Sequence, residues 1–422
     1  MRVLLLSTIS PYPKNVGKKV VLGGFCDYFK KTLSPADFHV MCFEPADVGP
    51  GIGVTVVPKP RMLNKVVNLG WWSLLARRKS IQESLFWSPE ALHAIESKIA
   101  EFRPDLVIFD TIRIGQYLRH LPGKSFKSVL YMEDLFSVRY ERILRAMAKF
   151  PDAAIDAMGN FAANIPGFLL PLYQSSRMVK RLLLQLERKL VQHTEYTMPA
   201  AFDAALLINE QEVRHLEQKT GLANVRVVSP MLNMDSQERL VPRAWSGRPE
   251  FVFLGSLNLA HNAFSIENFI ERHMDEMIAR IPGCLLRIIG RHPSPELVQL
   301  AAKYGKNVVV EGFVEDLDEV LSRCAGMIAP LLFGSGVKIK VIDAVRLGVP
   351  VVSTSYGAEG IALRAEGGIL VDDELSHFAE LCAGLLEPEA NAHHSRFSRQ
   401  IYLDSYSTGA VKAQYETFFS AG

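Results

Sequence analysis

Residues 326–361 read GMIAPLLFGSGVKIKVIDAVRLGVPVVSTSYGAEGI, and this stretch carries the clearest structural pattern in the chain. The apolar run over 326–330 predicts a buried strand, and the glycine-rich loop after it opens directly onto a helical pattern that begins near Val337. Gly348 and Pro350 end that helix, and 350–353 predicts the next strand. A strand, a helix and a second strand in this order indicate a β-α-β unit of a parallel sheet.

The glycine-rich loop is a candidate anion site. Gly334, Ser335 and Gly336 let backbone N–H groups approach an anion, and the N-terminus of the following helix adds positive potential. Lys338 and Lys340 stand in the first helical turn, where their charges oppose the helix dipole. A bound anion would offset that repulsion, so the two lysines favour a site that holds one.

Asp343 follows Ser335 by about two helical turns, between two apolar residues. At this distance it can reach the same site and accept hydrogen bonds from sugar hydroxyls. The alternative interpretation is a plain β-α-β unit with a glycine turn and solvated lysines. The coincidence of loop, helix start, two cations and a carboxylate favours the binding site.

The same alternation of short apolar runs and helical patterns continues along the whole chain. Strands are predicted over 2–9, 38–43, 54–57, 105–109, 127–131, 204–208, 250–254, 285–289, 307–310, 326–330, 350–353 and 369–371. Helices are predicted over about 176–199, and over 262–280, 294–304, 316–323, 338–347 and 376–386. Runs rich in Val, Ile and Leu without alternation are typical of parallel strands covered on both faces. The pattern predicts a doubly wound α/β fold.

Length and composition indicate how the chain is divided. With 422 residues, 48% hydrophobic and 22% charged, the chain exceeds one typical domain and is too apolar to be disordered. Pro, Gly, Ser and charged residues gather over 230–249, which predicts a linker. We therefore expect domains over 1–235 and 236–395, followed by a C-terminal helix over 396–422 that crosses back to the first domain.

The charge is unevenly divided between the two halves. Residues 1–230 hold 30 Lys and Arg against 21 Asp and Glu, whereas residues 231–422 hold 17 against 24. A basic half could meet a membrane surface, a phosphorylated acceptor or nucleic acid, or the difference could be ordinary scatter between domains. No nucleic-acid-binding motif accompanies the basic residues, so we expect no nucleic-acid partner.

The cysteine pattern points to a reducing compartment. The five cysteines are odd in number and widely spaced, which fits neither a disulfide framework nor a zinc site, and we expect no metal. The apolar N-terminus is too short for a signal peptide and predicts a buried first strand. Polar residues and prolines interrupt 153–173, so we expect no spanning helix there, while a segment lying on the interface remains open. The predicted location is cytoplasmic, and a peripheral position on the inner face of the membrane stays open.

Residues 250–371 resemble the donor-binding half of the GT-B glycosyltransferases, specifically glycosyltransferase family 4 (glycosyl transferases group 1). The similar stretches, in matching order and spacing, are Phe253–Ser256, His261–Ala263, Arg287–Arg291, Val310–Val314, Gly334–Lys340 with Asp343–Ala344, Gly348–Val352 and Glu359–Ile361. This resemblance implies two Rossmann-like domains facing each other across a cleft. It also implies a retaining transfer of a sugar from a UDP-, GDP- or similar nucleotide-sugar, which is a substrate, with no metal or other cofactor.

The resemblance also implies roles for residues of the second half. In the family, a strand end of the Gly-Phe-Val type contacts the base, which corresponds to Phe313 and Val314, and a helical carboxylate binds the ribose, which corresponds to Asp343. In the family, backbone amides of the loop and nearby cations bind the diphosphate. The donor-binding residues implied are thus Gly255, Ser256, Asn262, Arg291, Phe313, Val314, Gly334, Ser335, Gly336, Lys338, Lys340 and Asp343.

This sequence departs from the family pattern in the same region. The family's pair of glutamates is here Ser335 and Asp343, so the first carboxylate is missing and the second is about one methylene shorter. The usual Arg-x-Lys is Lys338-x-Lys340, which keeps the charge and loses a bidentate grip on phosphate. These departures put catalysis in doubt more than donor binding.

The first half resembles the family more weakly, through Pro11–Pro13 with Gly17, Pro104–Asp105 and Glu133–Tyr140. Gly17 is assigned to the acceptor side. Glu133 and Asp134, at the carboxyl end of a predicted strand, are candidate catalytic residues together with Lys340. Relatives often have a histidine near this position, so the catalytic base stays unassigned. Asp134 could equally be a helix N-cap, with Ser137 as a competitor.

We therefore expect an enzyme that builds a cell-surface polysaccharide or glycolipid by glycosyl transfer to a saccharide or lipid-linked acceptor, with the basic half toward a membrane surface. Two alternatives remain open. The first is a catalytically silent partner that binds a sugar nucleotide and supports another transferase, as the missing glutamate and histidine would allow. The second keeps the GT-B fold but changes the reaction to epimerisation or phosphorolysis.

Overall fold

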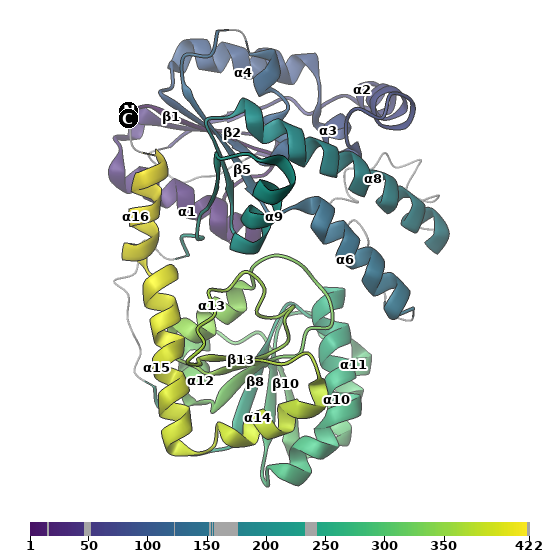
Figure 1. Ribbon diagram of the computed structural model, residues 1–422, viewed down its shortest axis with the longest axis vertical. Coiled ribbons are helices and arrows are strands. Elements are labelled where there is room, and N and C mark those ends of the chain that lie inside the picture. The colour runs from purple at the N-terminus through teal and green to yellow at the C-terminus, as the bar shows by residue number, and fades with distance from the viewer. Residues whose placement is uncertain are drawn as a thin grey trace. The chain divides into compact units, whose positions relative to one another are not determined.

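The computed structural model describes residues 1–14, 17–45, 52–121, 123–151, 153, 155, 176–232 and 243–419. The chain divides into two compact units (Figure 1). The first unit comprises Met1–Leu144, Ala157–Gln237 and Val411–Gly422, and the second comprises Arg145–Asp156 and Glu238–Ala410. Each unit is built on a parallel sheet with helices against it, as the alternation of apolar runs and helical patterns predicts.

The sheet of the first unit has the strand order β3-β2-β1-β4-β5-β6-β7, and every neighbouring pair is parallel. Its strands are β1 (Val3–Ser7), β2 (Phe38–Cys42), β3 (Gly53–Val56), β4 (Leu106–Asp110), β5 (Lys127–Glu133), β6 (Ala204–Leu207) and β7 (Val225–Val227). β1, β2 and β4 are buried along almost their whole length, which explains why their sequences show apolar runs without alternation.

The helices of this unit include two that share one hydrophobic core with the sheet. All the helices of the first unit are α1 (Gly17–Thr32), α2 (Met62–Asn68), α3 (Ile81–Phe86), α4 (Pro89–Phe102), α5 (Thr111–Gly115), α8 (Arg177–Thr197), α9 (Glu210–Thr220) and most of α16 (Thr408–Phe419), together with α6 (Phe136–Lys149), whose residues from Arg145 on belong to the second unit, as far as the structure describes the chain. Shorter turns are η1 (Pro35–Asp37), η3 (Leu118–His120) and η5 (Met198–Ala201), and η2 (Leu69–Leu75) is π-helical. Phe25 and Phe29 of α1 and Tyr415 and Phe419 of α16 lie in the same core cluster as the strands, so both helices cover one face of the sheet.

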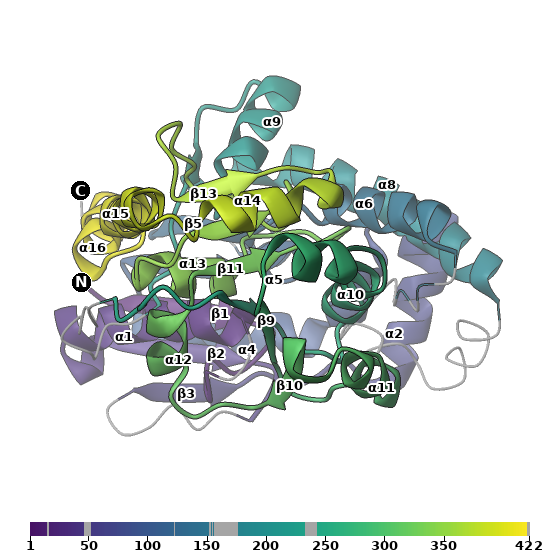
Figure 2. The same ribbon diagram turned by 90° about the horizontal axis from the view of Figure 1, so that it is seen from below.

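The second unit repeats the plan with the strand order β10-β9-β8-β11-β12-β13, again all parallel. Its strands are β8 (Glu250–Leu254), β9 (Leu285–Ile289), β10 (Val308–Gly312), β11 (Gly326–Ala329), β12 (Val351–Ser353) and β13 (Ile369–Val371). Its helices are α10 (Ala260–Arg280), α11 (Pro295–Lys303), α12 (Leu317–Arg323), α13 (Ile339–Arg346), α14 (Phe378–Gly384) and α15 (Pro388–Ser405), with the turns η6 (Gly305–Asn307) and η7 (Leu375–His377). α10, α11 and α14 share one core cluster with the strands, and Figure 2 shows α10 and α11 side by side.

The predicted strands and helices are confirmed within a few residues where the structure describes them, whereas α1 to α6 and α9 were not predicted individually, and three further points differ. β7 was not predicted because it is three residues long and two of them are exposed, which leaves no apolar run to recognise. The helical pattern near the C-terminus is two helices, α15 and α16, which end and begin on either side of Tyr406 and Ser407. α13 begins at Ile339 rather than near Val337. Half of the predicted linker, residues 233–242, and nearly all of 153–173 lie outside the described residues.

Two further predictions concern the cysteines and the membrane. All five cysteines are buried and none forms a disulfide, as their spacing predicts. Within the described part of the chain, no helix has the length and hydropathy needed to span a bilayer.

The strand orders indicate where a ligand would bind. In each unit the order reverses beside the first strand, between β1 and β4 in the first unit and between β8 and β11 in the second. In open parallel sheets, ligands bind beyond the carboxyl ends of the strands at this switch point. A ligand site is therefore expected at the loops that follow β8 and β11, and at those that follow β1 and β4.

Candidate active site

The glycine-rich loop follows β11 at the switch point of the second unit. Gly334 has φ +137° and Gly336 has φ +76°, which are conformations that residues with a Cβ rarely adopt. A Cβ at position 334 would meet His261 and the aliphatic chain of Lys338 at an ordinary contact distance of 3.8 Å, so the backbone conformation and not crowding calls for glycine there. These glycines are therefore required for the path of the loop, as the sequence predicts.

Lys338 lies inside the loop. Its side chain is 7% exposed, and its Nζ donates to the backbone carbonyl oxygens of Ser335 (3.1 Å) and Gly336 (2.5 Å). The carboxylate of Glu359 lies 3.9 Å from the same Nζ and is itself 6% exposed. The alternative of solvated lysines at a plain glycine turn is therefore wrong for Lys338, which holds the loop from within.

Lys340 links the loop to the neighbouring strand. Its Nζ donates to Asn262 Oδ1 (2.8 Å) and lies 4.5 Å from the centre of the Phe253 ring, while Asn262 Nδ2 donates to the carbonyl oxygen of Ser256 (3.0 Å). Burial, and secondly the charge of Lys338, hold the pKa of the Lys340 ammonium well below its usual value. An anion at this position would favour the charged form, so the site is electrostatically suited to a phosphate group.

Asp343 lies about one turn into α13 and has neighbours of both charges. Burial raises the pKa of its carboxyl to about 6, Arg346 lowers this pKa, and Asp318 of α12 raises it. The guanidinium of Arg346 in turn contacts Asp318 at 2.5 Å. A carboxylate with so elevated a pKa gains from hydrogen-bond donors such as sugar hydroxyls, because they stabilise its charged form.

The other donor-side predictions lie on the loops after β8, β9 and β10, at the same edge of the sheet. Gly255 and Gly290 approach so closely that a Cβ on Gly290 would lie 1.8 Å from the carbonyl oxygen of Gly255. The guanidinium of Arg291 lies 4.3 Å from the centre of the Phe313 ring, and Phe313 is 61% exposed. Val314 is half-buried beside it. An exposed ring under a cation offers a stacking surface of the kind a nucleobase uses.

In the first unit, a charged cluster forms at the carboxyl ends of β1, β4 and β5. The Nζ of Lys18, the second residue of α1, lies 3.2 Å from Asp110 Oδ1 and 3.4 Å from Glu133 Oε2. Ser7, at the end of β1, donates from its hydroxyl to Asp110 Oδ2 (2.8 Å). Gly17 begins α1 and therefore positions this lysine. The cluster lies at the switch point of its own sheet.

Glu133 and Asp134 differ in their surroundings. Burial would raise the pKa of Glu133, but Lys18, Arg139 and Arg113 together outweigh it, so its pKa is lowered and it is a charged carboxylate at neutral pH. Asp134 is 1% exposed and accepts from Arg139 at 2.5 and 2.9 Å, whereas the Glu133 side chain is 17% exposed. This geometry favours Glu133 over Asp134 for contact with a substrate.

Two residues at this edge of the first unit's sheet have left-handed backbone conformations. Glu133 has φ +70° and Thr111, directly after β4, has φ +66°. Left-handed conformations of residues other than glycine cost of the order of 1–3 kcal/mol and gather at functional sites. Two of them at the ends of adjacent strands support a functional role for this edge.

Sequence reasoning missed three of these residues. Asp110 and Lys18 belong to no motif, and only the strand order brings them to Glu133. Glu359 lies in a stretch that matches the family, Glu359–Ile361, so its signal was present although no role was assigned to it. All predicted donor-side residues lie in the second unit, whereas Gly17, Glu133 and Asp134 lie in the first. Among the described residues, no three His, Cys, Asp or Glu side chains gather as a metal site would need.

Comparisons with known proteins agree with this fold. Residues 248–388 match the family model described as glycosyl transferases group 1. No curated protein matches the sequence. Among solved structures, the chain is similar to a sucrose-phosphate synthase from Thermosynechococcus elongatus (12% identity, TM-score 0.66, 99% of this chain and 98% of that one).

Two further structures are similar over their whole length. They are HepE from Anabaena in complex with UDP (11% identity, TM-score 0.63, 100% of both chains) and the lipopolysaccharide outer core galactosyltransferase WaaB (12% identity, TM-score 0.62, 99% of both chains). At these identities the likeness concerns the fold. Together, the two doubly wound sheets and the similar structures show that the chain has the GT-B fold, and residues 248–388, about a third of the chain, match the family described as glycosyl transferases group 1.

Proposed function

We propose that the protein transfers a sugar from a nucleotide-sugar to a lipid-linked or saccharide acceptor, with retention of the anomeric configuration, in the synthesis of a cell-surface polysaccharide or glycolipid. The observation that carries the proposal is the pair of lysines at the glycine-rich loop, of which Lys338 is buried and Lys340 is half-buried. HepE, which shares the fold, was solved with UDP and with UDP and glucose, which supports a nucleoside diphosphate as the donor's leaving group.

In this reaction the bond between the sugar's C1 and the diphosphate oxygen breaks, and the nucleoside diphosphate leaves with the electron pair. The acceptor hydroxyl oxygen forms the new bond to C1, and its proton passes to an oxygen of the departing diphosphate. Negative charge grows on the leaving diphosphate, so fixed cations and amides beside it lower the barrier. Lys340 and the amides of the glycine-rich loop would supply that stabilisation, and Lys338 would hold the loop in place.

The remaining donor contacts follow from the chemistry of the second unit. Asp343 would accept hydrogen bonds from the ribose hydroxyls, and the base would stack near Phe313 and Val314 with Arg291 beside it. Gly255, Ser256 and Asn262 would line the opposite side of the loop. In the first unit, Glu133 would accept a hydrogen bond from an acceptor hydroxyl, with Lys18 and Asp110 fixing its orientation.

A cytoplasmic location, on the inner face of the membrane, fits this proposal. Five buried thiols without a disulfide are compatible with a reducing compartment. The excess of Lys and Arg in residues 1–230 supports attraction to an anionic membrane surface.

A donor screen tests the proposal. The full chain is incubated with radiolabelled UDP-, GDP- and ADP-sugars and a membrane extract, and the anomeric configuration of the product is read by NMR. We expect transfer from one nucleotide class, with retention. Failure with every donor would refute the transferase assignment, and an inverted product would refute retention alone.

Two substitutions locate the donor site. Lys340→Ala is expected to lower kcat/KM by about 10²-fold or more, as the loss of one preorganised donor typically does. Asp343→Ala is expected to weaken nucleotide binding by about tenfold to a hundredfold, the value of hydrogen bonds to a charged group. Lys306→Ala, an exposed lysine of the same unit, is the matched control. Wild-type behaviour of both site variants would refute this placement of the donor.

A further inference from the structure

The segment 62–75, formed by α2 and η2, buries the polar side chains of Asn68 and Ser73 and exposes most of its apolar ones. Asn68 is 8% exposed and donates from Nδ2 to the carbonyl oxygens of Ser84 (3.1 Å) and Trp87 (2.9 Å). Ser73 is fully buried, and its hydroxyl lies 2.8 Å from the Ser84 hydroxyl. The outer side chains, which we call the apolar face, are Leu63, Val66, Val67, Trp71, Leu74 and Leu75.

This face is large enough to need an explanation. Leu63 is 72% exposed, Leu75 69% and Trp71 55%. Single exposed apolar side chains are ordinary, but a contiguous apolar face on a helical segment indicates an interaction surface. The inward hydrogen bonds of Asn68 and Ser73 fix which side faces out, so the orientation is determined by the fold.

The basic residues next to the apolar face indicate what kind of partner it binds. Residues 59–79 contain six basic residues and no acidic one: Lys59, Arg61, Lys65, Arg77, Arg78 and Lys79. A second copy of this chain seated on the face would bring two such basic segments together, and their repulsion opposes that pairing. A surface that combines apolar groups with anions would instead complement both the apolar face and the basic residues beside it.

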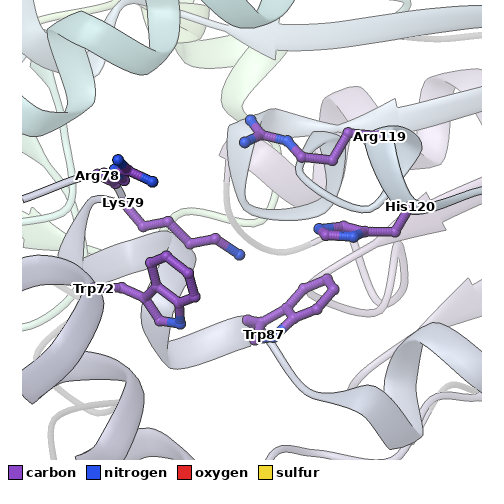
Figure 3. A pocket seen from close by; sticks show the side chains of 6 residues that line it. All are labelled: Trp72, Arg78, Lys79, Trp87, Arg119 and His120. Carbon is purple, nitrogen blue, oxygen red and sulfur yellow. The ribbon is translucent and has the colours of Figure 1, made fainter. Parts of the chain in front are cut away.

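A cavity of about 210 Å³ opens beside the apolar face (Figure 3). It is lined by Trp72, Arg78, Lys79, Trp87, Arg119 and His120. The Nζ of Lys79 points into it, 4.1 Å from the centre of the Trp87 ring and 5.7 Å from that of Trp72, and donates to Gln116 Oε1 (3.0 Å). The His120 ring lies 4.4 Å from that of Trp87.

The charged side chains around the cavity favour the binding of an anion. Burial lowers the pKa of Lys79 to about 8, with Glu83 raising this pKa and Arg119 lowering it further. With this pKa Lys79 is mostly charged at neutral pH, and an anionic group beside Arg78, Lys79 and Arg119 would favour its charged form further. At about 210 Å³ the cavity lies below the ~300–1,000 Å³ of pockets for drug-sized ligands, which suits a group such as a phosphate ester.

We propose that segment 62–75 docks on an anionic lipid surface, with the apolar face entering the headgroup–acyl boundary and the cavity taking the phosphate of a lipid headgroup. Interfacial helices combine an apolar face with flanking Lys and Arg, and tryptophan concentrates at that depth of a bilayer. This lipid surface would bring the enzyme to the lipid-linked acceptor of the proposed function. Only its biological purpose rests on that function, because lipid binding is measured without turnover.

Vesicle sedimentation tests the surface on the full chain. We expect binding to equimolar phosphatidylglycerol and phosphatidylcholine at least about tenfold tighter than to phosphatidylcholine alone, since several basic residues near an anionic surface each add to the attraction. The double variant Leu63→Asp, Leu75→Asp should lose most binding to both vesicles. Leu363→Asp, at a 51% exposed leucine of the second unit, is its matched control. Equal binding by wild type and the double variant would overturn the proposal.

A separate substitution tests the role of the cavity. Lys79→Gln should weaken binding to the anionic vesicles severalfold and affect binding to phosphatidylcholine much less, because the choline ammonium opposes entry of that lipid's phosphate among basic side chains, whereas Lys306→Gln should change neither. If Lys79→Gln binds anionic vesicles like the wild type, the headgroup assignment is refuted. If inorganic phosphate raises the Tm in a Lys79-dependent way while no vesicle binds, the cavity takes a free anion and the lipid surface is refuted.

Fluorescence of the wild type keeps the proposal testable if a variant fails to fold. Trp71 and Trp72 should shift to shorter wavelength on anionic vesicles and be quenched by brominated lipid, and Trp71→Phe should remove much of that signal. Self-association that Leu63→Asp abolishes, without any vesicle binding, would assign the face to a second copy instead. Because these readouts need no donor, lipid binding without transfer would refute only the proposed function, and transfer to a soluble acceptor without lipid binding would refute only this surface.

Discussion

At the scale of single residues, the elevated pKa of Asp343 predicts how nucleotide affinity depends on pH. Its pKa of about 6 means that the carboxyl is ionised at pH 7.5 and mostly neutral at pH 5. If the carboxylate accepts ribose hydrogen bonds, wild type should bind a nucleoside diphosphate about tenfold more tightly than Asp343→Asn at pH 7.5, because hydrogen bonds to a charged group are the stronger ones. This advantage should disappear as the pH falls through 6.

The Asn variant is also the control for the ligand. A terminal phosphate has a second pKa near 6 and contributes its own pH dependence, which both proteins share. The ratio of the two Kd values, measured by calorimetry at each pH, isolates Asp343. A ratio that stays constant between pH 5 and 7.5 would mean that the carboxylate does not contact the nucleotide.

Residues that belong to a motif could be located from sequence, whereas residues joined only by topology could not. The loop glycines and lysines were predicted because turn chemistry, helix start and charge coincide within seven positions. The inward direction of Lys338 was not predictable, since it depends on the carbonyls of Ser335 and Gly336 and on Glu359. Asp110 and Lys18 lie 92 positions apart and meet only because β1 and β4 are neighbours.

At the scale of elements, the close approach of the loops after β8 and β9 gives a sharp stability prediction. A Cβ at Gly290 would lie 1.8 Å from the carbonyl oxygen of Gly255, and the Gly290 N–H donates to the carbonyl oxygen of Gly312 (2.8 Å). Gly290→Ala must therefore displace the backbone, which costs more than the ~1–3 kcal/mol of ordinary overpacking. Denaturant unfolding should show this loss, together with weaker nucleotide binding.

The matched control is Gly384→Ala in α14, where a Cβ would meet nothing within 4 Å. There alanine should be neutral or stabilising by up to about 1 kcal/mol, because it replaces a glycine in a helix. Equal effects at the two positions would show that the loops relax freely and that their close approach is not required.

The elements themselves could be predicted because parallel strands covered on both faces leave unbroken apolar runs. The segment 62–75 shows where this reasoning ends. Its apolar residues suggest a buried helix, yet Asn68 and Ser73 face the protein and Leu63 and Leu75 face out. Hydrophobic periodicity tells which residues share a face, and the contacts of the polar side chains decide which face is inside.

At the scale of the whole molecule, the two compact units are formed from interleaved parts of one chain. The second unit ends at Ala410, and α16 then contributes to the core of the first. Tyr415 is fully buried there, with its ring 5.2 Å from those of Phe25 and Tyr28 and its hydroxyl accepting from the backbone N–H of Met231 (3.3 Å). The last helix, α16, therefore contributes to the stability of the first unit.

This arrangement predicts that damage to α16 lowers the stability of the first unit selectively. Tyr415→Ala should cost about 3–5 kcal/mol, the usual loss for a large aromatic side chain in a core. Chains of more than one unit commonly unfold in separable steps, so calorimetry should show one transition at lower temperature and a nucleotide-stabilised transition that stays in place. Thr417→Ala, on the exposed side of α16, should leave both transitions unchanged. If Tyr415→Ala also lowers the nucleotide-stabilised transition to the same degree, the two units unfold as one and α16 stabilises the whole chain.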